Sequence, residues 1–83
     1  MKFSERNAIL QDINKRCAEL HDRYTSKLNM LSDEDWQTYI HSMDAIREEY
    51  KDSSIDKFAG AVVMAYLDDT EIVQKKIKEM ENC

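Results

Sequence analysis

Residues 10–31 read LQDINKRCAELHDRYTSKLNML, and apolar side chains recur in this stretch at every third or fourth position. They are Leu10, Ile13, Cys17, Leu20, Tyr24, Leu28 and Leu31. This spacing places them in one stripe along a single face of an α-helix. With Ser4 as the N-cap, the pattern predicts a helix from Ser4 to about Met30, which would be roughly 40 Å long.

A second helix is predicted directly after this stretch. Ser32 precedes three consecutive acids at positions 33–35, and acids are favourable in a first turn because a helix N-terminus carries partial positive charge. Apolar residues then repeat at helical spacing as far as about Lys51, namely Trp36, Tyr39, Ile40, Met43, Ile46 and Tyr50. We expect the first two helices to form an antiparallel hairpin, with a tight turn at about residues 29–32.

The remaining sequence predicts one or two further helices. Residues 52–54 break the pattern, and Ile55–Leu67 is apolar around most of its circumference, as in a central helix. The small residues 59–61 predict close packing inside the domain. Residues 68–71 have the form of a capping box, so a fourth helix either starts there or continues the third. The expected fold is all-α, a small three- or four-helix bundle built on an antiparallel helical hairpin, with residues 1–83 as one domain.

Composition excludes several classes of protein. The chain has 83 residues, of which 42% are hydrophobic, and its charged residues are interleaved with apolar ones, as in a folded domain. A net charge of −5 argues against binding nucleic acid, because that affinity comes from Lys and Arg on phosphates. The most apolar stretch, residues 58–67, is about half of what a bilayer requires, and no signal peptide is visible. We expect a cytoplasmic protein without a membrane or nucleic-acid partner.

The sequence predicts no catalytic, cofactor-binding or metal-binding residues. His21, His41, Cys17 and Cys83 do not stand at metal-ligand spacings. A chain with one glycine has little material for a phosphate loop or an oxyanion hole. Cys17 lies on the apolar stripe and is expected to be a buried core thiol. We therefore expect a protein that is not an enzyme.

An uneven distribution of charge is the main functional signal. Between Ser32 and Asp56 there are eight acids against Arg47 and Lys51, whereas residues 1–31 have four acids against six bases. An acidic helix with aromatic residues is typical of a surface that docks on a basic patch. A solvated face, with the aromatic residues in the core, is the competing interpretation. The predicted partner-binding residues are Asp35, Trp36, Tyr39, Asp44, Glu48 and Glu49.

The sequence therefore predicts a small protein–protein interaction module, such as an adaptor, an inhibitor or a phage-type accessory or regulatory protein. The alternatives are a structural homo-oligomer and an acidic nucleic-acid mimic that blocks a DNA- or RNA-binding enzyme. A homodimer is also expected, because the predicted first helix exceeds the second, which spans only roughly 28 Å. Part of the first apolar stripe would then lack an intramolecular partner.

Overall fold

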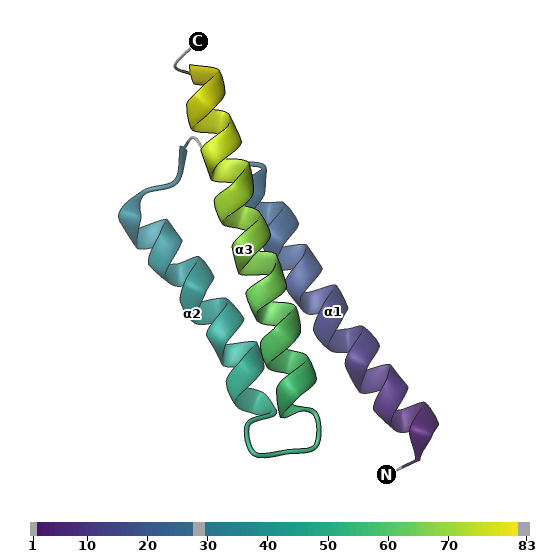
Figure 1. Ribbon diagram of the computed structural model, residues 1–83. Helices are drawn as coiled ribbons and strands as arrows, with labels where there is room; N and C mark the ends of the chain where they lie inside the picture. Colours follow the sequence, from purple (N-terminus) through teal and green to yellow (C-terminus); the bar gives the residue numbers. More distant parts are fainter. Residues whose placement is uncertain (1, 28–29, 82–83) are drawn as a thin grey trace.

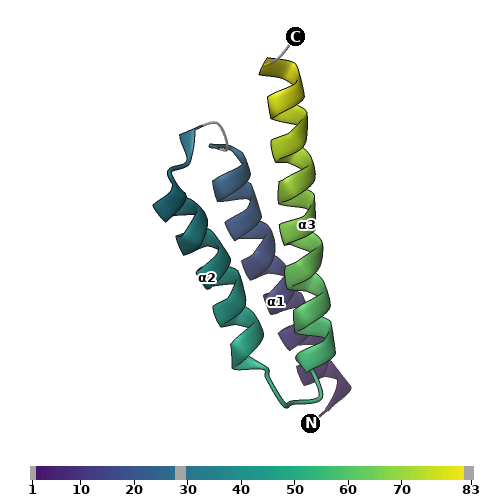
Figure 2. The ribbon, with the colours of Figure 1, turned by 60° about the vertical axis from the view of Figure 1, so that its left-hand side comes forward.

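The computed structural model describes residues 2–27 and 30–81, and this part of the chain is a bundle of three helices (Figure 1). They are α1 (Phe3–Thr25), α2 (Asp33–Glu49) and α3 (Asp56–Glu81). The C-terminal end of α3 extends past the other two helices (Figure 2). The molecule is elongated, with extents of 52 × 21 × 17 Å. The expected all-α class and a three-helix bundle are confirmed.

The core is built from the predicted apolar stripes of all three helices. Ile13 and Cys17 of α1 are fully buried, as expected for the first stripe. Leu10, Leu20 and Tyr24 pack against the edge of the core and stay partly exposed. The other buried residues are Tyr39, Met43 and Ile46 on α2, Ile55 before α3, and Ala59, Val63 and Thr70 on α3.

Both ends of α1 differ from the prediction. The helix begins at Phe3 with Lys2 as its N-cap, and the Lys2 amide donates to the Glu5 carboxylate at 3.4 Å, so Ser4 is not the cap. The helix ends at Thr25 rather than at Met30. Here the hydroxyls of Thr25 and Ser26 donate to the carbonyls of His21 and Arg23, and such local bonds compete with helix continuation. Residue 29 of the predicted turn lies outside the described residues.

The start of α2 agrees with the prediction. The Ser32 hydroxyl accepts from the Asp35 amide at 3.1 Å, and the Asp35 carboxylate accepts from the Ser32 amide at 3.2 Å. This reciprocal pair is a capping box with Asp in the third position. The helix ends at Glu49, two residues before the predicted Lys51. A turn follows in which Asp52 has a φ of 63°, a left-handed conformation that Asp tolerates better than most residues.

The third and fourth predicted helices are one continuous helix, α3, and Asp68 does not begin a new one. Thr70, in the expected capping segment, donates instead to the Tyr66 carbonyl within the same helix at 2.8 Å. At 26 residues, α3 spans roughly 39 Å, and its packing against α1 is the most extensive in the bundle. The first helix is still longer than the second, with 23 residues against 17, and the continuous α3 packs along α1 as well. The dimer stays a prediction.

Candidate protein-binding surface

The outward side of α2 carries exposed acids. The inward side is fixed by Tyr39, Met43 and Ile46, which are buried at helical spacing. On the opposite side, four polar residues share one face because their positions differ by about whole turns. We call these exposed residues the outer α2 face: Glu34, His41, Asp44 and Glu48. The Glu48 carboxylate lies 3.9 Å from the Lys51 ammonium, a loose contact between exposed groups.

The structure divides the six predicted partner-binding residues. Asp44 and Glu48 are exposed together on the outer α2 face. Asp35 is exposed, but its carboxylate accepts from the amide of the N-cap Ser32. Trp36 is partly buried, with its ring centroid 6.2 Å from that of Tyr39. Tyr39 is fully buried and is therefore a core residue rather than a surface anchor.

Glu49 holds α2 against α1. Its carboxylate accepts two hydrogen bonds from the Arg16 guanidinium, at 2.7 and 3.0 Å. This bidentate geometry is the strongest form of an Arg–carboxylate pair. The hydrogen bond from Arg16 lowers the pKa of Glu49 below its ordinary value of 4.5. Glu49 therefore already has a partner within the chain, and only the part of its carboxylate that remains exposed is open to a second one.

Tyr39 ties α2 to α3 inside the core. Its hydroxyl lies 2.8 Å from the Thr70 hydroxyl, which donates onward to the Tyr66 carbonyl. The Tyr39 ring stacks on that of Tyr24 with centroids 4.8 Å apart. Burial raises the pKa of Tyr39, and the hydrogen bond with Thr70 partly opposes that rise. The sequence missed the buried role of Thr70, because a threonine beside two aspartates resembles a helix cap.

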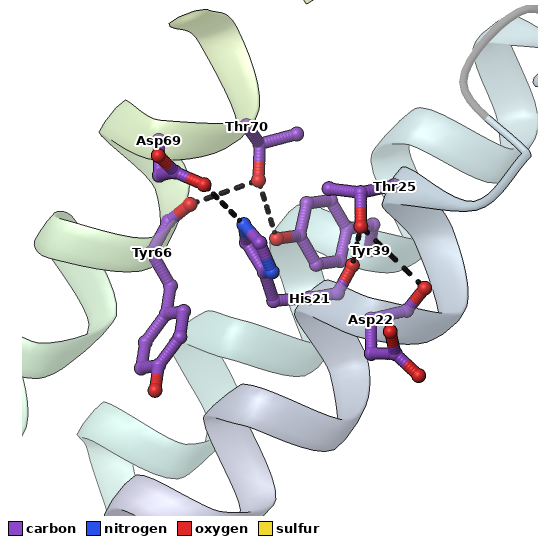
Figure 3. A network of polar contacts seen from close by, with 7 residues as sticks. All are labelled: His21, Asp22, Thr25, Tyr39, Tyr66, Asp69 and Thr70. Carbon is purple, nitrogen blue, oxygen red and sulfur yellow. Dashed lines mark hydrogen bonds and ion pairs between the residues drawn. The ribbon is translucent and has the colours of Figure 1, made fainter. Parts of the chain in front are cut away.

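A second polar group joins α1 to α3 close to this hydroxyl pair (Figure 3). His21 Nε2 lies 2.7 Å from Asp69 Oδ2, and the His21 ring is tilted against the Tyr66 ring at 5.2 Å. The Asp69 carboxylate therefore satisfies one ring nitrogen of His21. The nearby hydroxyls of Thr25 and Thr70 are hydrogen-bonded to backbone carbonyls. These hydrogen bonds hold α1 and α3 in position, because the polar side chains in this group already bond to other parts of the chain.

The described residues offer little else for chemistry. No group of three or more His, Cys, Asp or Glu side chains in residues 2–27 and 30–81 is arranged to hold a metal ion. Cys17 is completely buried as predicted, and burial raises the pKa of its thiol, which opposes formation of the reactive thiolate. In the same part of the chain, no helix is long and apolar enough to cross a bilayer.

Several exposed apolar residues were not among the predicted site residues. Ile40 on α2 is 41% exposed, and Met64 and Ile72 on α3 are 50% and 52% exposed. The sequence did contain a signal for these exposed residues. Ile40 directly follows the core residue Tyr39, so the two cannot lie on the same narrow stripe of the helix. A helix with apolar residues beyond one stripe presents some of them outside the core.

Comparison with known proteins gave no further identification. No protein-family model, curated protein or solved structure matches this chain. The candidate surface therefore rests on the geometry of the outer α2 face and of the residues beside it.

Proposed function

We propose that this chain is a small, non-enzymatic interaction module that regulates or connects other proteins by docking on a basic surface. The observation that carries the proposal is the exposure of Asp44 and Glu48 on one face of a helix whose opposite side is locked into the core. Complementary potentials accelerate encounter and select partners. We assign this activity to the cytoplasm, because a free core thiol at Cys17 fits a reducing compartment.

Rigidity of α2 supports the proposal. A helix whose inward side chains are buried presents its outward acids from fixed backbone positions. Fixed groups lose less conformational entropy on binding than mobile ones. The outer α2 face is therefore suited to recognition as well as to solubility.

We further propose that α1 and α2 form the antiparallel hairpin on which this rigidity depends. Two contacts support it, the stacking of Tyr24 on Tyr39 and the hydrogen bonding of Arg16 to Glu49. From the first contact to the second, the residue number decreases on α1, from 24 to 16, and increases on α2, from 39 to 49. The test is a distance measurement between pairs of spin labels that are attached without a disulfide bond. The distance between labels at Asp12 and Asp52 should be shorter than the distance between labels at Asp12 and Asp33.

The function is tested with the full chain as bait in its native cell, followed by binding measurements with the purified partner. We expect the double variant Asp44→Lys/Glu48→Lys to weaken binding about tenfold, and high salt to weaken wild-type binding. Glu19→Lys/Asp22→Lys is the matched control, because both residues are exposed acids on α1. Unchanged binding of the double variant at low salt would contradict the proposal. Competition with DNA or RNA for the same partner would indicate a nucleic-acid mimic.

Self-association is the second candidate, and the exposed side of α3 favours it. Ala61, Met64 and Ala65 are exposed there at helical spacing, and small residues allow another helix to approach closely. A two-fold dimer is the commonest symmetric arrangement. Sedimentation equilibrium in reducing buffer at tens of micromolar would show a dimer mass for wild type and a monomer mass for Ala61→Glu/Ala65→Glu. A monomer mass for wild type would eliminate this candidate.

A further inference from the structure

The outer side of α3 lies opposite the core. Thr70 is buried and bonds to Tyr39 of α2, and Ile72 is two residues further along the helix. Two residues turn an α-helix by about 200°, so Ile72 points away from the core, and it is 52% exposed. Along the C-terminal half of α3, both other helices lie on one side of it (Figure 2). Ile72 is therefore the apolar centre of a helix face that α1 and α2 do not cover.

Charged residues of opposite sign flank Ile72 on this face. Counted from Ile72, the aspartates Asp68 and Asp69 stand four and three residues before it, and the lysines Lys75 and Lys76 stand three and four residues after it. Such spacings place Asp68, Ile72 and Lys75 on one side of the helix. All three are exposed, and they line one shallow hollow of about 440 Å³. This surface thus has an acidic half and a basic half on either side of one apolar residue.

Helix capping does not explain the two aspartates. They stand in the interior of the 26-residue α3, whereas the favourable effect of a helix N-terminus on acids is confined to the first turn. Asp69 pairs with His21 at 2.7 Å. Among residues 2–27 and 30–81, neither Asp68 nor Lys75 forms an ion pair. Both of these charges are available to another molecule.

The pattern is complementary to itself when two copies of α3 lie antiparallel. If Ile72 faces Ile72 of a second copy, each step forward on one helix is level with one step back on the other. Asp68 then lies level with Lys76 of the second copy, and Asp69 lies level with its Lys75. A parallel pair would place aspartates against aspartates and lysines against lysines, and like charges across an interface oppose binding. The charges therefore favour the antiparallel arrangement.

We propose that this face of α3 binds a second copy of the chain in an antiparallel, two-fold contact centred on Ile72. The two Ile72 side chains pack together on the two-fold axis, and each Asp68 pairs with Lys75 or Lys76 of the other copy. Every such pair occurs twice, because a two-fold contact uses the same surface on both copies. Ala65, seven residues before Ile72, lies on the same side of the helix and is part of the contact. The inference rests on self-association, the second candidate function, and adds the residues at its centre.

Sedimentation equilibrium of the full chain, in reducing buffer at tens of micromolar, tests the contact. We expect a dimer mass for wild type and a monomer mass for Ile72→Glu, which places two carboxylates together on the axis. Asp68→Lys and Lys75→Glu should each weaken dimerisation at least tenfold, because each change sets like charges side by side at two places in the dimer. All three variants change exposed residues, and circular dichroism checks that each one folds.

A mixture of the two charge variants tests the antiparallel pairing. In a dimer of one Asp68→Lys chain and one Lys75→Glu chain, the introduced lysine lies against the introduced glutamate, and the unchanged Lys75 lies against the unchanged Asp68. We expect this mixture to form a heterodimer, although neither variant dimerises well alone. Positions 68 and 75 are roughly 10 Å apart along one helix, so such a rescue cannot arise within a single chain. Asp22→Lys is the control, because it reverses an exposed acid of α1 and should leave dimerisation within twofold of wild type.

Three results would overturn the inference. A dimer mass for Ile72→Glu, together with a monomer mass for Ala61→Glu/Ala65→Glu, would move the contact away from Ile72 and leave self-association standing. A mixture of the charge variants that stays monomeric would contradict the antiparallel pairing. A monomer mass for wild type would refute the contact and self-association together. Docking on a basic partner is tested separately, by the effect of Asp44→Lys/Glu48→Lys on binding of that partner.

Discussion

Tyr39 and Thr70 show how one hydrogen bond connects two helices at the scale of single residues. Tyr39→Phe removes the hydroxyl and leaves Thr70 bonded to the Tyr66 carbonyl, so we expect a loss of about 0.5–1.5 kcal/mol in unfolding free energy. Thr70→Val leaves the Tyr39 hydroxyl buried without its partner, and we expect a loss of about 1–3 kcal/mol. Urea unfolding measures both.

The double variant Tyr39→Phe/Thr70→Val measures the free energy of the interaction between the two hydroxyls, apart from the other effects of each substitution. Because both polar groups are then absent, the loss should be smaller than the sum of the two single losses. Additive losses would show that the two hydroxyls do not stabilise one another.

The pair of Arg16 and Glu49 makes stability depend on pH. Hydrogen bonding from Arg16 lowers the pKa of Glu49 in the folded protein, so Glu49 contributes stability above its unfolded pKa and loses that contribution as pH falls through the lower, folded pKa. We expect the melting temperature of wild type to fall more between pH 7 and pH 3 than that of Glu49→Gln. The difference should be small, because the Glu49 side chain is 50% exposed.

Glu48→Gln is the control for this measurement. Glu48 makes only the 3.9 Å contact with Lys51, so its replacement should leave the pH dependence close to that of wild type. If Glu49→Gln also follows the wild-type curve, the bidentate pair contributes nothing measurable to folding.

At the scale of whole helices, burial separates residues that look equivalent in the first apolar stripe. Ile13 is fully buried and Leu20 only partly so. We expect Ile13→Ala to cost about 2–5 kcal/mol, as large-to-small changes in a core do, and Leu20→Ala to cost less. Chemical denaturation of the two variants checks the order. A larger loss for Leu20→Ala would place the centre of the core nearer the end of α1.

Gly60 gives a prediction for α3. An added Cβ would meet Arg47 Nε at 3.4 Å and Cζ at 3.9 Å, which is ordinary contact with an exposed, flexible side chain. Alanine is about 1 kcal/mol better than glycine inside a helix, so Gly60→Ala should raise the unfolding free energy by up to about that amount. Ala61→Gly, one residue along and exposed, should lower it by a similar amount. Destabilisation by Gly60→Ala would show that the Arg47 side chain cannot accommodate the added methyl group.

At the scale of the whole molecule, all three helices contribute to one core. We therefore expect cooperative unfolding in a single transition. Far-ultraviolet circular dichroism reports all the helices, and Trp36 fluorescence reports the packing of the start of α2 against the core, so their midpoints should coincide. An earlier midpoint for Trp36 would mean that the start of α2 separates before the rest of the bundle unfolds.

Much of this architecture follows from local sequence rules. The spacing of Ile13 and Cys17, and of Tyr39, Met43 and Ile46, assigned two helices and most of their buried residues correctly. Ser32 followed by acids at positions 33–35 located the start of α2, because a helix cap depends on residues within one turn of each other. Burial of Cys17 followed from its place in the stripe.

Tertiary structure decided the features that depend on residues far apart in the chain. Asp69 and Thr70 have the composition of a helix start, yet their partners His21 and Tyr39 lie on other helices, and α3 runs on without a break. Packing also placed Tyr39 in the core rather than on the candidate surface, and it brought Glu49 to Arg16 of α1. Sequence spacing determines which face of a helix is apolar, because that face is set by the helical period alone. Which neighbour covers that face is decided only when the helices pack, because the free energy of burial depends on all three of them together.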